Sequence, residues 1–438
     1  MTEHTVPFAG AIFDLDGTLL DSAWVWREVD RAFFEAMGMA EPEDYARTIQ
    51  GMSFREAAEY TVRRFAIPRT AEAVMEEWTR MTAEAYACRV AMKPGALDYL
   101  RGLKRAGVKL AVATANREEL FGPTLRRFGA WELFDAFCTS AEVGDVSKDD
   151  GALFRLAAGR LGVAPAECVV FEDTLEGVTG ARRAGMGAYA VRDAGNAHHA
   201  EKIAALADGV IDDFTEMARF HRLPEKGRCV VFTARCDGDV NRAYVPGPGD
   251  WVVCADGGWL LARRAGVRPD LVIGDFDSSD PPGTGPVERY PVEKDDTDTM
   301  LCLKRGLSMG FDRFLIVGGF GGRIDHTLGN IQAMRYVADR AARIEMSDGL
   351  SWASVVEGGT LRVPAGAIGG KAAKLSVFAL DRVCRGVSVR GAKWTVEGAA
   401  WTNGFPLGVS NEFAGEWAEI SVDEGALLVT VCGEPPME

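Results

Sequence analysis

The sequence predicts an α/β protein with two parallel sheets, the second of which continues into a β-rich region. Three observations carry this prediction. Short buried apolar runs alternate with amphipathic helical segments in two separate stretches of the chain. In each stretch, one apolar run ends in a pair of aspartates at positions i and i+2. After residue 347, glycine becomes frequent and short β-type runs dominate. Alternation of strand and helix is typical of parallel sheets with right-handed crossovers.

The first stretch predicts an α/β core with a helical insertion. A buried strand is expected at 11–13, and helical periodicity follows it, broken at Pro68. The helices of this insertion are expected at 24–37, 54–65 and 71–87. From about residue 93 the expected order is helix 96–105, strand 109–113, helix 153–161, strand 168–171 and helix 179–184. We therefore expect a core at 1–223 with a helical cap at about 22–92.

The second stretch begins after a polar segment at 212–227, which we interpret as a domain boundary. Its expected order is strand 229–232, strand 251–254, helix 260–265, strand 270–273, helix 297–307, strand 313–317 and helix 327–342. The β-rich runs at 360–363, 375–379, 418–422 and 427–431 predict a β-sandwich or barrel. The expected domains are thus an α/β unit at 228–346 and a β-sandwich at 347–438, with Trp394 and Trp401 in the sandwich core.

Composition narrows the class of protein. A chain of 438 residues is too long for one ordinary hydrophobic core, and a content of 47% hydrophobic residues is enough for two or three domains. A formal net charge of −15 argues against nucleic acid or an anionic membrane as a partner. Nine cysteines without a Cys-x-x-Cys pair favour a reducing cytoplasm over a disulfide framework. No run approaches the ~20 apolar residues of a membrane span.

The first stretch places a set of polar residues at expected strand ends. Asp14 and Asp16 follow the first strand, Thr114 follows the strand at 109–113, and Glu172 and Asp173 follow the strand at 168–171. In a doubly wound sheet these ends converge on one crevice. Asp14 can attack phosphorus to form an aspartyl-phosphate, and Asp16 can serve as acid and then base. Lys148 and Mg²⁺ would offset phosphoryl charge, and Thr114 would donate a hydrogen bond.

The run Asp-Leu-Asp-Gly-Thr-Leu-Leu-Asp-Ser at 14–22 resembles the haloacid dehalogenase superfamily, and the resemblance extends over about residues 9–222. It implies a Rossmann-like core and a Mg²⁺ ion held by Asp14, the main-chain carbonyl of Asp16 and Asp173, with Glu172 close by. It also implies a mobile cap of the β-phosphoglucomutase-like branch, which reaches the substrate near residues 51–56. One departure is that Lys148 is followed by Asp149 and Asp150, where the family usually has a stretch with proline. These added acids are a candidate influence on substrate choice.

The second stretch has a denser polar constellation. Asp256 ends one expected strand, Asp275 and Asp277 follow the next, and Lys294 to Asp298 open a helix. The glycines at 318–322 would let the backbone approach a polyanion, with Arg323 as its charge partner. A Gly-x-x-x-x-Gly-Lys-Ser/Thr loop is absent from the sequence, which excludes a P-loop kinase.

Together with residues 408–412, this constellation closely resembles thiamine pyrophosphokinase over about residues 228–435. The resemblance implies transfer of a pyrophosphoryl group from ATP to thiamine, which gives thiamine diphosphate and AMP. It implies a homodimer in which thiamine lies between one subunit's α/β unit and the other's β-sandwich. The implied site residues are Asp256, Asp275, Asp277 and Asp298 for Mg²⁺, Lys294, Thr297, Arg323 and Asp325 for ATP, and Ser410 and Asn411 for thiamine; Asp275 and Asp298 are also expected to be catalytic.

Three functions remain open for the first stretch. A phosphatase acting on thiamine monophosphate would supply free thiamine to the kinase, a link inferred from the fusion alone. A sugar-phosphate phosphatase or β-phosphoglucomutase-like mutase without a pathway link is the second. A non-catalytic module that stabilises the dimer or regulates the kinase is the third.

Overall fold

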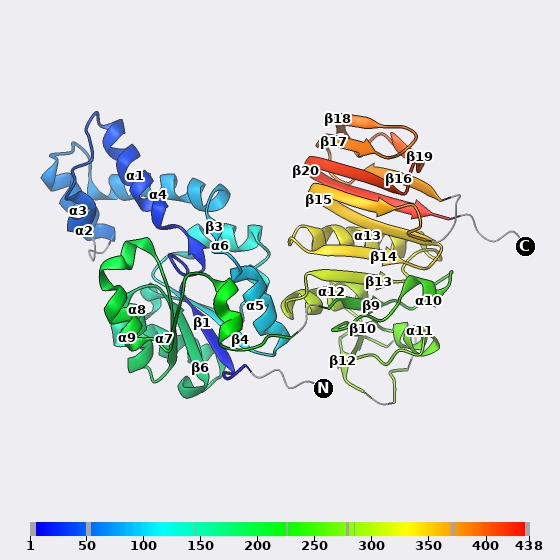
Figure 1. The fold of residues 1–438 in the computed structure, drawn as a ribbon, viewed down its shortest axis with the longest axis horizontal. Coiled ribbons are helices and arrows are strands. Elements are labelled where there is room, and N and C mark those ends of the chain that lie inside the picture. The colour runs from blue at the N-terminus through cyan, green and yellow to red at the C-terminus, as the bar shows by residue number, and fades with distance from the viewer. Residues whose placement is uncertain are drawn as a thin grey trace, which may run out of the picture. The chain divides into compact units, whose positions relative to one another are not determined.

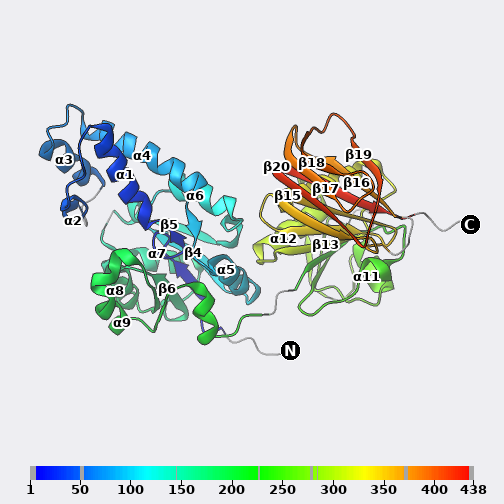
Figure 2. The same ribbon diagram turned by 45° about the horizontal axis from the view of Figure 1, so that its top comes forward.

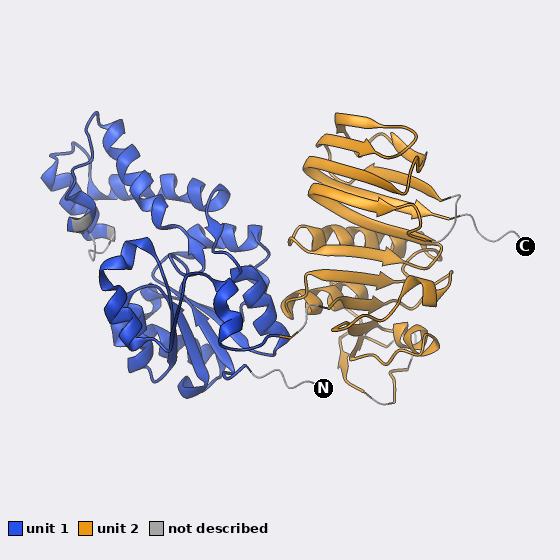
Figure 3. Cartoon of the chain, viewed as in Figure 1, with its two compact units in different colours: residues 1–223 blue, residues 224–438 orange. Residues whose placement is uncertain are grey.

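The computed structural model describes residues 6–49, 54–144, 146–224, 227–276, 280–283, 285–368 and 373–433, without the side chains of Arg47 and Phe54. The chain forms two compact units, Met1–Leu223 and Pro224–Glu438 (Figure 3). Among the helices of the described residues, none combines the length and the hydrophobicity of a membrane-spanning segment.

The first unit is built on a six-stranded parallel sheet (Figure 1). The strand order is β5 (Ala136–Thr139), β4 (Lys109–Thr114), β1 (Gly10–Phe13), β6 (Cys168–Glu172), β7 (Gly187–Val191) and β8 (Gly209–Ile211). The core helices are α5 (Ala96–Arg105), α6 (Glu118–Arg127), α7 (Ala152–Leu161), α8 (Leu175–Arg183) and α9 (Ala200–Leu206). Because β1 lies between β4 and β6, its carboxyl end is the topological switch point of the sheet.

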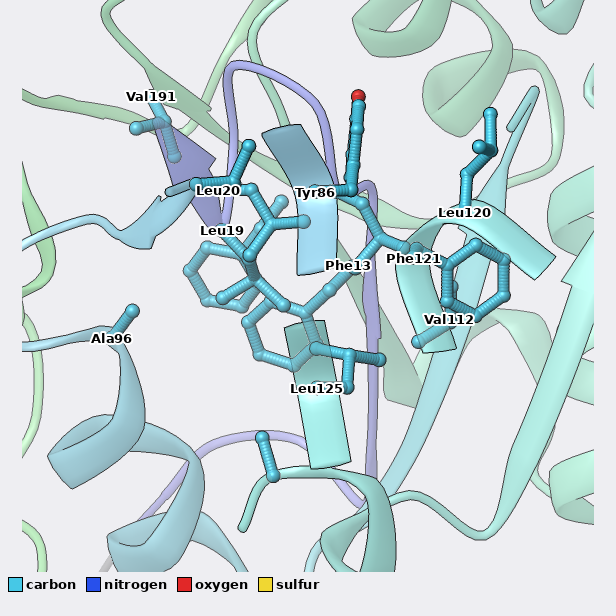
Figure 4. Packing of buried hydrophobic residues seen from close by; sticks show 14 of the residues in the cluster. Phe13, Leu19, Leu20, Tyr86, Ala96, Val112, Leu120, Phe121, Leu125 and Val191 are labelled. Carbon is cyan, nitrogen blue, oxygen red and sulfur yellow. The ribbon is translucent and has the colours of Figure 1, made fainter. Parts of the chain in front are cut away.

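Side-chain alternation along β1 assigns the two faces of this sheet. Ala11 and Phe13 join the hydrophobic cluster shared with α5, α6 and the cap, whereas Ile12 joins the cluster under α7 and α8. The ring of Phe13 stacks on Phe171 of β6, with centroids 4.6 Å apart. Figure 4 shows Phe13, Leu19 and Tyr86 within this packing, so one apolar cluster extends from β1 to the cap.

The insertion between β1 and α5 is helical, as predicted. Its helices are α1 (Ala23–Ala36), α2 (Tyr45–Ile49), α3 (Phe54–Arg64) and α4 (Ala71–Cys88). Figures 1 and 2 show them grouped outside the layers of the sheet and its helices. The two connections to the core pair as short antiparallel strands, β2 (Leu20–Asp21) and β3 (Ala91–Met92).

One core helix contains residues that usually interrupt helices. Helix α6 contains Gly122 and Pro123 in its interior, yet it is helical throughout. Leu120, Phe121 and Leu125 are buried in the main cluster. Burial of this apolar face outweighs the cost of the proline, an example of tertiary packing that overrides local propensity.

The second unit contains a parallel sheet that continues into antiparallel strands. The parallel strands are β12 (Val287–Arg289), β11 (Leu271–Gly274), β10 (Trp251–Ala255), β9 (Cys229–Phe232), β13 (Arg313–Val317) and β14 (Arg343–Ser347). The helices are α10 (Val240–Ala243), α11 (Gly258–Arg264), α12 (Asp298–Ser308) and α13 (Ile324–Ala338). The first strand, β9, lies between β10 and β13, which puts the switch point at its carboxyl end.

The β-rich region continues the same sheet. Strand β15 (Ser351–Pro364) pairs with β14 on one side and with the long β20 (Trp417–Cys432) on the other. The remaining strands are β16 (Lys374–Ala379), β17 (Cys384–Arg390), β18 (Val396–Trp401) and β19 (Gly408–Glu412). Because the hydrogen-bond ladder crosses from β14 to β15, the predicted boundary at 346–347 falls within β14 rather than in a linker.

Candidate active sites

The expected nucleophile of the first unit lies just beyond the carboxyl end of β1. Asp14 is buried, with 4% of its surface exposed, and its Oδ1 accepts a hydrogen bond from Lys148 Nζ at 2.5 Å. Burial raises the pKa of Asp14 to about 7, although the Lys148 ammonium acts in the opposite direction. The ionised carboxylate that a nucleophile needs therefore depends on nearby positive charge.

Lys148 supplies part of that charge. It begins a short 3₁₀ helix (Lys148–Asp150), and its Nζ also donates to Glu172 Oε1 at 2.6 Å. Burial acts to lower the pKa of Lys148, but Asp14 and Glu172 together hold it above its ordinary value. The ammonium thus bridges the ends of β1 and β6.

A third carboxylate completes a candidate metal site. One oxygen each of Asp14, Glu172 and Asp173 lie within 4.8 Å of one another, and all three residues are buried. Burial, then the neighbouring Glu172 and Asp14, raise the pKa of Asp173 well above its usual range. Three buried carboxylates beside one ammonium leave an excess of negative charge, and oxygen ligands of this kind suit Mg²⁺. The donor set therefore fits the metal that the sequence predicts.

Asp16 is held by donors from three parts of the unit. Its Oδ1 accepts from Ser22 Oγ (2.7 Å) and from the hydroxyl of Tyr86 on cap helix α4, and its Oδ2 accepts from Asn116 Nδ2 (3.0 Å). Thr114, at the end of β4, accepts from the backbone N–H of Asn116 through its own Oγ1 (3.1 Å). The predicted residues of the first site other than Lys148 thus lie at the adjoining carboxyl ends of β1, β4 and β6, and Lys148 reaches them from the 3₁₀ helix.

The acids that follow Lys148 are paired with arginines of the neighbouring helices. Asp149 accepts from Arg183 of α8 at 2.6 Å, and Asp150 accepts from Arg155 of α7 at 3.1 Å. These exposed ion pairs give no support to an influence on substrate choice. Of the predicted cap segment, residues 51–53 lie outside the described residues, and Arg55 pairs with Glu72 of α4 at 2.7 Å.

The candidate kinase site is a pocket of about 540 Å³ at the switch point of the second sheet. It is lined by loops that follow β9, β10, β11 and β13 and by the start of α12. The predicted residues that line it are Asp256, Asp275, Lys294, Thr297, Asp298 and Arg323. Asp277 lies outside the described residues.

The acidic side of this pocket also suits a cation. Lys294 donates to Asp275 Oδ2 and lies 3.1 Å from Asp298 Oδ1. Asp298 Oδ1 is buried, and the Lys294 ammonium is its charged neighbour. Burial raises the pKa of Asp298, Lys294 lowers it, and Asp275 and Asp256 raise it further. A buried carboxylate oxygen in a group of acids is a fitting metal ligand.

Backbone strain marks the same region. Asp256 (φ 43°) and Phe276 (φ 58°), which follows Asp275, have the left-handed conformation that non-glycine residues rarely adopt. Ser410, predicted to bind thiamine, is a further example at φ 61°. Strain of this kind gathers at functional sites, where the surrounding structure holds it in place.

Two predicted ATP contacts are engaged elsewhere in this structure. Asp325 does not line the pocket; it accepts from Arg323 Nη2 (2.6 Å) and from the backbone N–H of His326 (3.0 Å). The Thr297 hydroxyl accepts from the backbone N–H of Met300 (3.2 Å) and so caps α12. Arg323 is exposed at the rim, and His326 lines the pocket beside it.

A second pocket of the same unit, of about 280 Å³, lies on the β-rich part. Ser410 and Asn411 of β19 line it together with Trp394, Trp401 and Leu407. Asn411 fixes the loop before β18, because its side chain bonds both the N–H (3.0 Å) and the carbonyl (2.7 Å) of Trp394. Trp401 is buried as predicted, but the core prediction for Trp394 is wrong. Its side chain lies in this loop and is 55% exposed.

Comparisons with known proteins agree with this division. A haloacid dehalogenase-like hydrolase family matches residues 8–185. The thiamin pyrophosphokinase catalytic domain matches residues 248–346, and the thiamin pyrophosphokinase vitamin B1 binding domain matches residues 367–427. A phosphorylated carbohydrates phosphatase of Thermotoga maritima is 32% identical over 179 residues, which cover 40% of this chain and 81% of the relative. The chain is a haloacid dehalogenase-like hydrolase fused to a thiamin pyrophosphokinase.

Further relatives of the two halves each cover slightly less than half of the chain. Validoxylamine A 7'-phosphate phosphatase of Streptomyces hygroscopicus subsp. limoneus is 31% identical over 212 residues, which cover 47% of this chain and 94% of the relative. The crystal structure of thiamine pyrophosphokinase from Bacillus subtilis aligns with a TM-score of 0.43 at 23% identity, and covers 48% of this chain and 100% of that chain.

Sequence reasoning missed several residues at both sites. In the hydrolase, Asn116 and Tyr86 contact Asp16, and Asn196 Nδ2 donates to Asp173 Oδ2 at 2.6 Å. In the pyrophosphokinase, Arg235 and Asn330 line the main pocket. Asn116 and Arg235 follow strand ends, a signal that could have found them, whereas Tyr86 lies within a long amphipathic helix and gives no such signal.

Proposed function

We propose that the first unit is a Mg²⁺-dependent phosphatase that acts through an aspartyl-phosphate. The observation that carries this proposal is the Lys148 ammonium between Asp14 and Glu172, beside the buried Asp173. Asp14 attacks phosphorus, while Asp16 protonates the leaving oxygen and then accepts a proton from the attacking water. Asp14, the carbonyl of Asp16 and Asp173 would hold Mg²⁺, with Glu172 close by, and the ion would neutralise phosphoryl charge.

The remaining predicted residues of this site act on the phosphoryl group and the nucleophile through their charge and position. Lys148 offsets charge on the phosphoryl group and favours the ionised form of Asp14. Thr114 lies at the end of β4 with its hydroxyl turned to the same loop as Asn116, from where it can donate to a phosphoryl oxygen. Exchange of Asp14 for asparagine would remove the nucleophile and leave this arrangement in place.

The proposed substrate is thiamine monophosphate. The pyrophosphokinase requires a free hydroxyl on thiamine, and the monophosphate blocks that hydroxyl. A phosphatase on the same chain would therefore supply the kinase substrate. The names of the relatives support a second candidate, a sugar phosphate, because one of them acts on phosphorylated carbohydrates.

In the second unit, we assign Asp256, Asp275, Asp277 and Asp298 to Mg²⁺ and the nucleotide. Lys294, Thr297, Arg323 and Asp325 are the proposed ATP contacts, and Ser410 and Asn411 are the proposed thiamine contacts. A bound cation would stabilise charge on the transferred group, and the protein would supply the alignment of the thiamine oxygen with phosphorus. Asp325 would have to exchange its pairing with Arg323 to reach the nucleotide.

The pyrophosphokinase is proposed to work as a homodimer. Its smaller pocket is lined by exposed apolar residues, among them Trp394, Leu407 and Val409. An open apolar wall of this kind suits thiamine covered by a second subunit. Light scattering of the chain with and without thiamine tests this directly, and a monomer in both conditions contradicts it.

One experiment separates the two phosphatase substrates. The intact chain is given thiamine monophosphate and MgATP without thiamine, and thiamine diphosphate is measured. Our proposal predicts product in the wild type, loss of product in Asp14→Asn, and recovery in that variant when free thiamine is added. Absence of product from a chain that converts free thiamine would exclude thiamine monophosphate and favour a sugar phosphate.

A further inference from the structure

Arg235 is a cation of the nucleotide pocket to which neither the sequence nor the family comparisons assign a role. It lies in the loop that follows β9, the first strand of the second sheet. This loop and the glycine loop after β13 border the switch point, where ligands of doubly wound sheets bind. Both Arg235 and Arg323, one from each loop, line the pocket of about 540 Å³.

The backbone of Arg235 is fixed against the glycine loop. Its carbonyl accepts from the N–H of Gly319 and from Thr233 Oγ1, each at 3.1 Å. A Cβ atom at Gly318 would lie 2.1 Å from the same carbonyl. The glycine at this position therefore permits the two loops to pack directly on each other.

The side chain of Arg235 follows the same surface. A Cβ atom at Gly322 would lie 3.0 Å from its Cδ and 3.2 Å from its Nε and Nη1. Its Nε also pairs with Asp237 Oδ1 at 2.6 Å, and both partners are substantially exposed, 63% and 41%. An exposed pair of this kind contributes little to folding, so stability gives no strong reason for an arginine here.

The distribution of charge in the pocket gives a functional reason for an arginine at position 235. The carboxylates of Asp256, Asp275 and Asp298 line it together with the cations Lys294, Arg235 and Arg323. Cations next to these acidic residues can contact only part of the polyphosphate chain of a nucleotide. The remaining phosphate oxygens need hydrogen-bond donors from another wall of the pocket. The planar guanidinium group matches two phosphate oxygens at once.

We propose that Arg235 is a phosphate-binding residue for ATP, which acts with Arg323 across the glycine loop. The proposal rests on the kinase function of the second unit and adds a residue to its nucleotide site.

The test uses the full-length chain and two measurements, the Kd for MgATP by calorimetry and the KM values for ATP and thiamine. Arg235→Ala should raise the ATP Kd and KM about tenfold or more and change the thiamine KM less than about twofold. Arg235→Lys, which keeps the charge without the fork, should fall between the wild type and Arg235→Ala.

Two further variants make the test specific. Asp237→Asn removes the ion pair but leaves the guanidinium, so its ATP Kd should equal or fall below the wild-type value. Arg242→Ala is the matched control, because Arg242 is exposed, forms a similar pair with Asp239 at 3.7 Å, and does not line the pocket. Its ATP Kd should not change.

Two results would overturn the proposal. One is an ATP Kd within about twofold of wild type in both Arg235 variants, with unfolding curves that show folded protein. The other is equal weakening in Asp237→Asn and Arg235→Ala, which would show that only the ion pair matters. Failure of the kinase function itself would be seen separately, as absence of thiamine diphosphate formation by the wild type.

Discussion

The hydroxyl of Tyr86, on cap helix α4, donates a hydrogen bond to Asp16, the proposed acid and base of the phosphatase. Tyr86 is fully buried and belongs to the cluster that joins the cap to β1 (Figure 4). Its carbonyl accepts from Thr124 Oγ1 of α6 at 2.6 Å, so it is held from both sides. The position of the cap is therefore linked to the orientation of the group that moves the proton.

Loss of this hydroxyl should impair chemistry more than binding. We expect Tyr86→Phe to lower the kcat for phosphate release by roughly ten- to a hundredfold, because hydrogen bonds to charged groups contribute roughly 1.5–3 kcal/mol. The KM should change little. Steady-state hydrolysis with the best phosphate ester measures both constants.

The matched control for this variant lies in the same cap. The Tyr45 hydroxyl bonds Thr61 Oγ1 at 2.7 Å, away from the catalytic residues, and Tyr45 is equally buried. Tyr45→Phe should lower the cap's stability and leave kcat near the wild-type value. Equal loss of kcat in both variants would show that general damage to the cap, rather than the bond to Asp16, explains the effect.

A second prediction concerns pH. Burial, with a smaller contribution from Glu41, raises the pKa of Asp30 in helix α1 to about 7. Its unfolded value is about 3.9, so the folded protein binds more protons between about pH 4 and 7. The free energy of unfolding should therefore fall as pH rises through this range, by at most about 1.4 kcal/mol per unit from this group.

Asp30→Asn removes this titration and should flatten that slope. Urea unfolding of the full chain at pH 5 and pH 7.5 measures the difference. Glu35→Gln, on the exposed face of the same helix, is the control and should keep the wild-type slope. Identical slopes for wild type and Asp30→Asn would contradict the raised pKa.

A third prediction concerns the close approach of helix α8 to the first site. A Cβ atom at Gly177 would lie 2.1 Å from Glu172 Cδ, and Glu172 is fully buried. Gly177→Ala should displace this carboxylate, destabilise the unit by roughly 1–3 kcal/mol and reduce phosphatase activity. Denaturant unfolding and phosphate release measure the two effects.

Gly159 offers the opposite case on helix α7. A Cβ atom there would meet nothing within 4 Å. Gly159→Ala should stabilise the unit by about 0.5–1 kcal/mol and leave both activities intact. Destabilisation by Gly159→Ala, or full activity in Gly177→Ala, would contradict the packing described for these helices.

The fold class and much of the first site could be predicted because both follow from short-range pattern. Strand-end polar residues such as Asp14 and Asp173 are recognisable from the apolar runs before them, and parallel strands bring them to one edge. Tyr86 and Asn196 could not be found in this way. Their places depend on the cap and on the loop after β7, and each contacts a carboxylate far away in the sequence.

The β-rich region shows a different limit. Trp394 is a residue type that is common in protein cores, but it lies in a loop. In a loop, the period-2 alternation of a strand does not assign a side chain to one face. Continuity of the sheet across β14 and β15 was also beyond prediction, because pairing of strands is a long-range property. The local sequence pattern indicates that a strand exists, but it does not indicate which other strand pairs with it.

The central claim is that one chain carries two independent active sites, and reciprocal inactivation tests it most directly. Phosphate release and ATP-dependent formation of thiamine diphosphate are measured for wild type, Asp14→Asn and Asp275→Asn. We predict that Asp14→Asn loses phosphate release by several orders of magnitude and keeps the kinase, since the amide cannot act as the nucleophile. Asp275→Asn should lose the kinase and keep phosphate release. Loss of both activities in either variant, or undiminished activity at the altered site, would contradict the account.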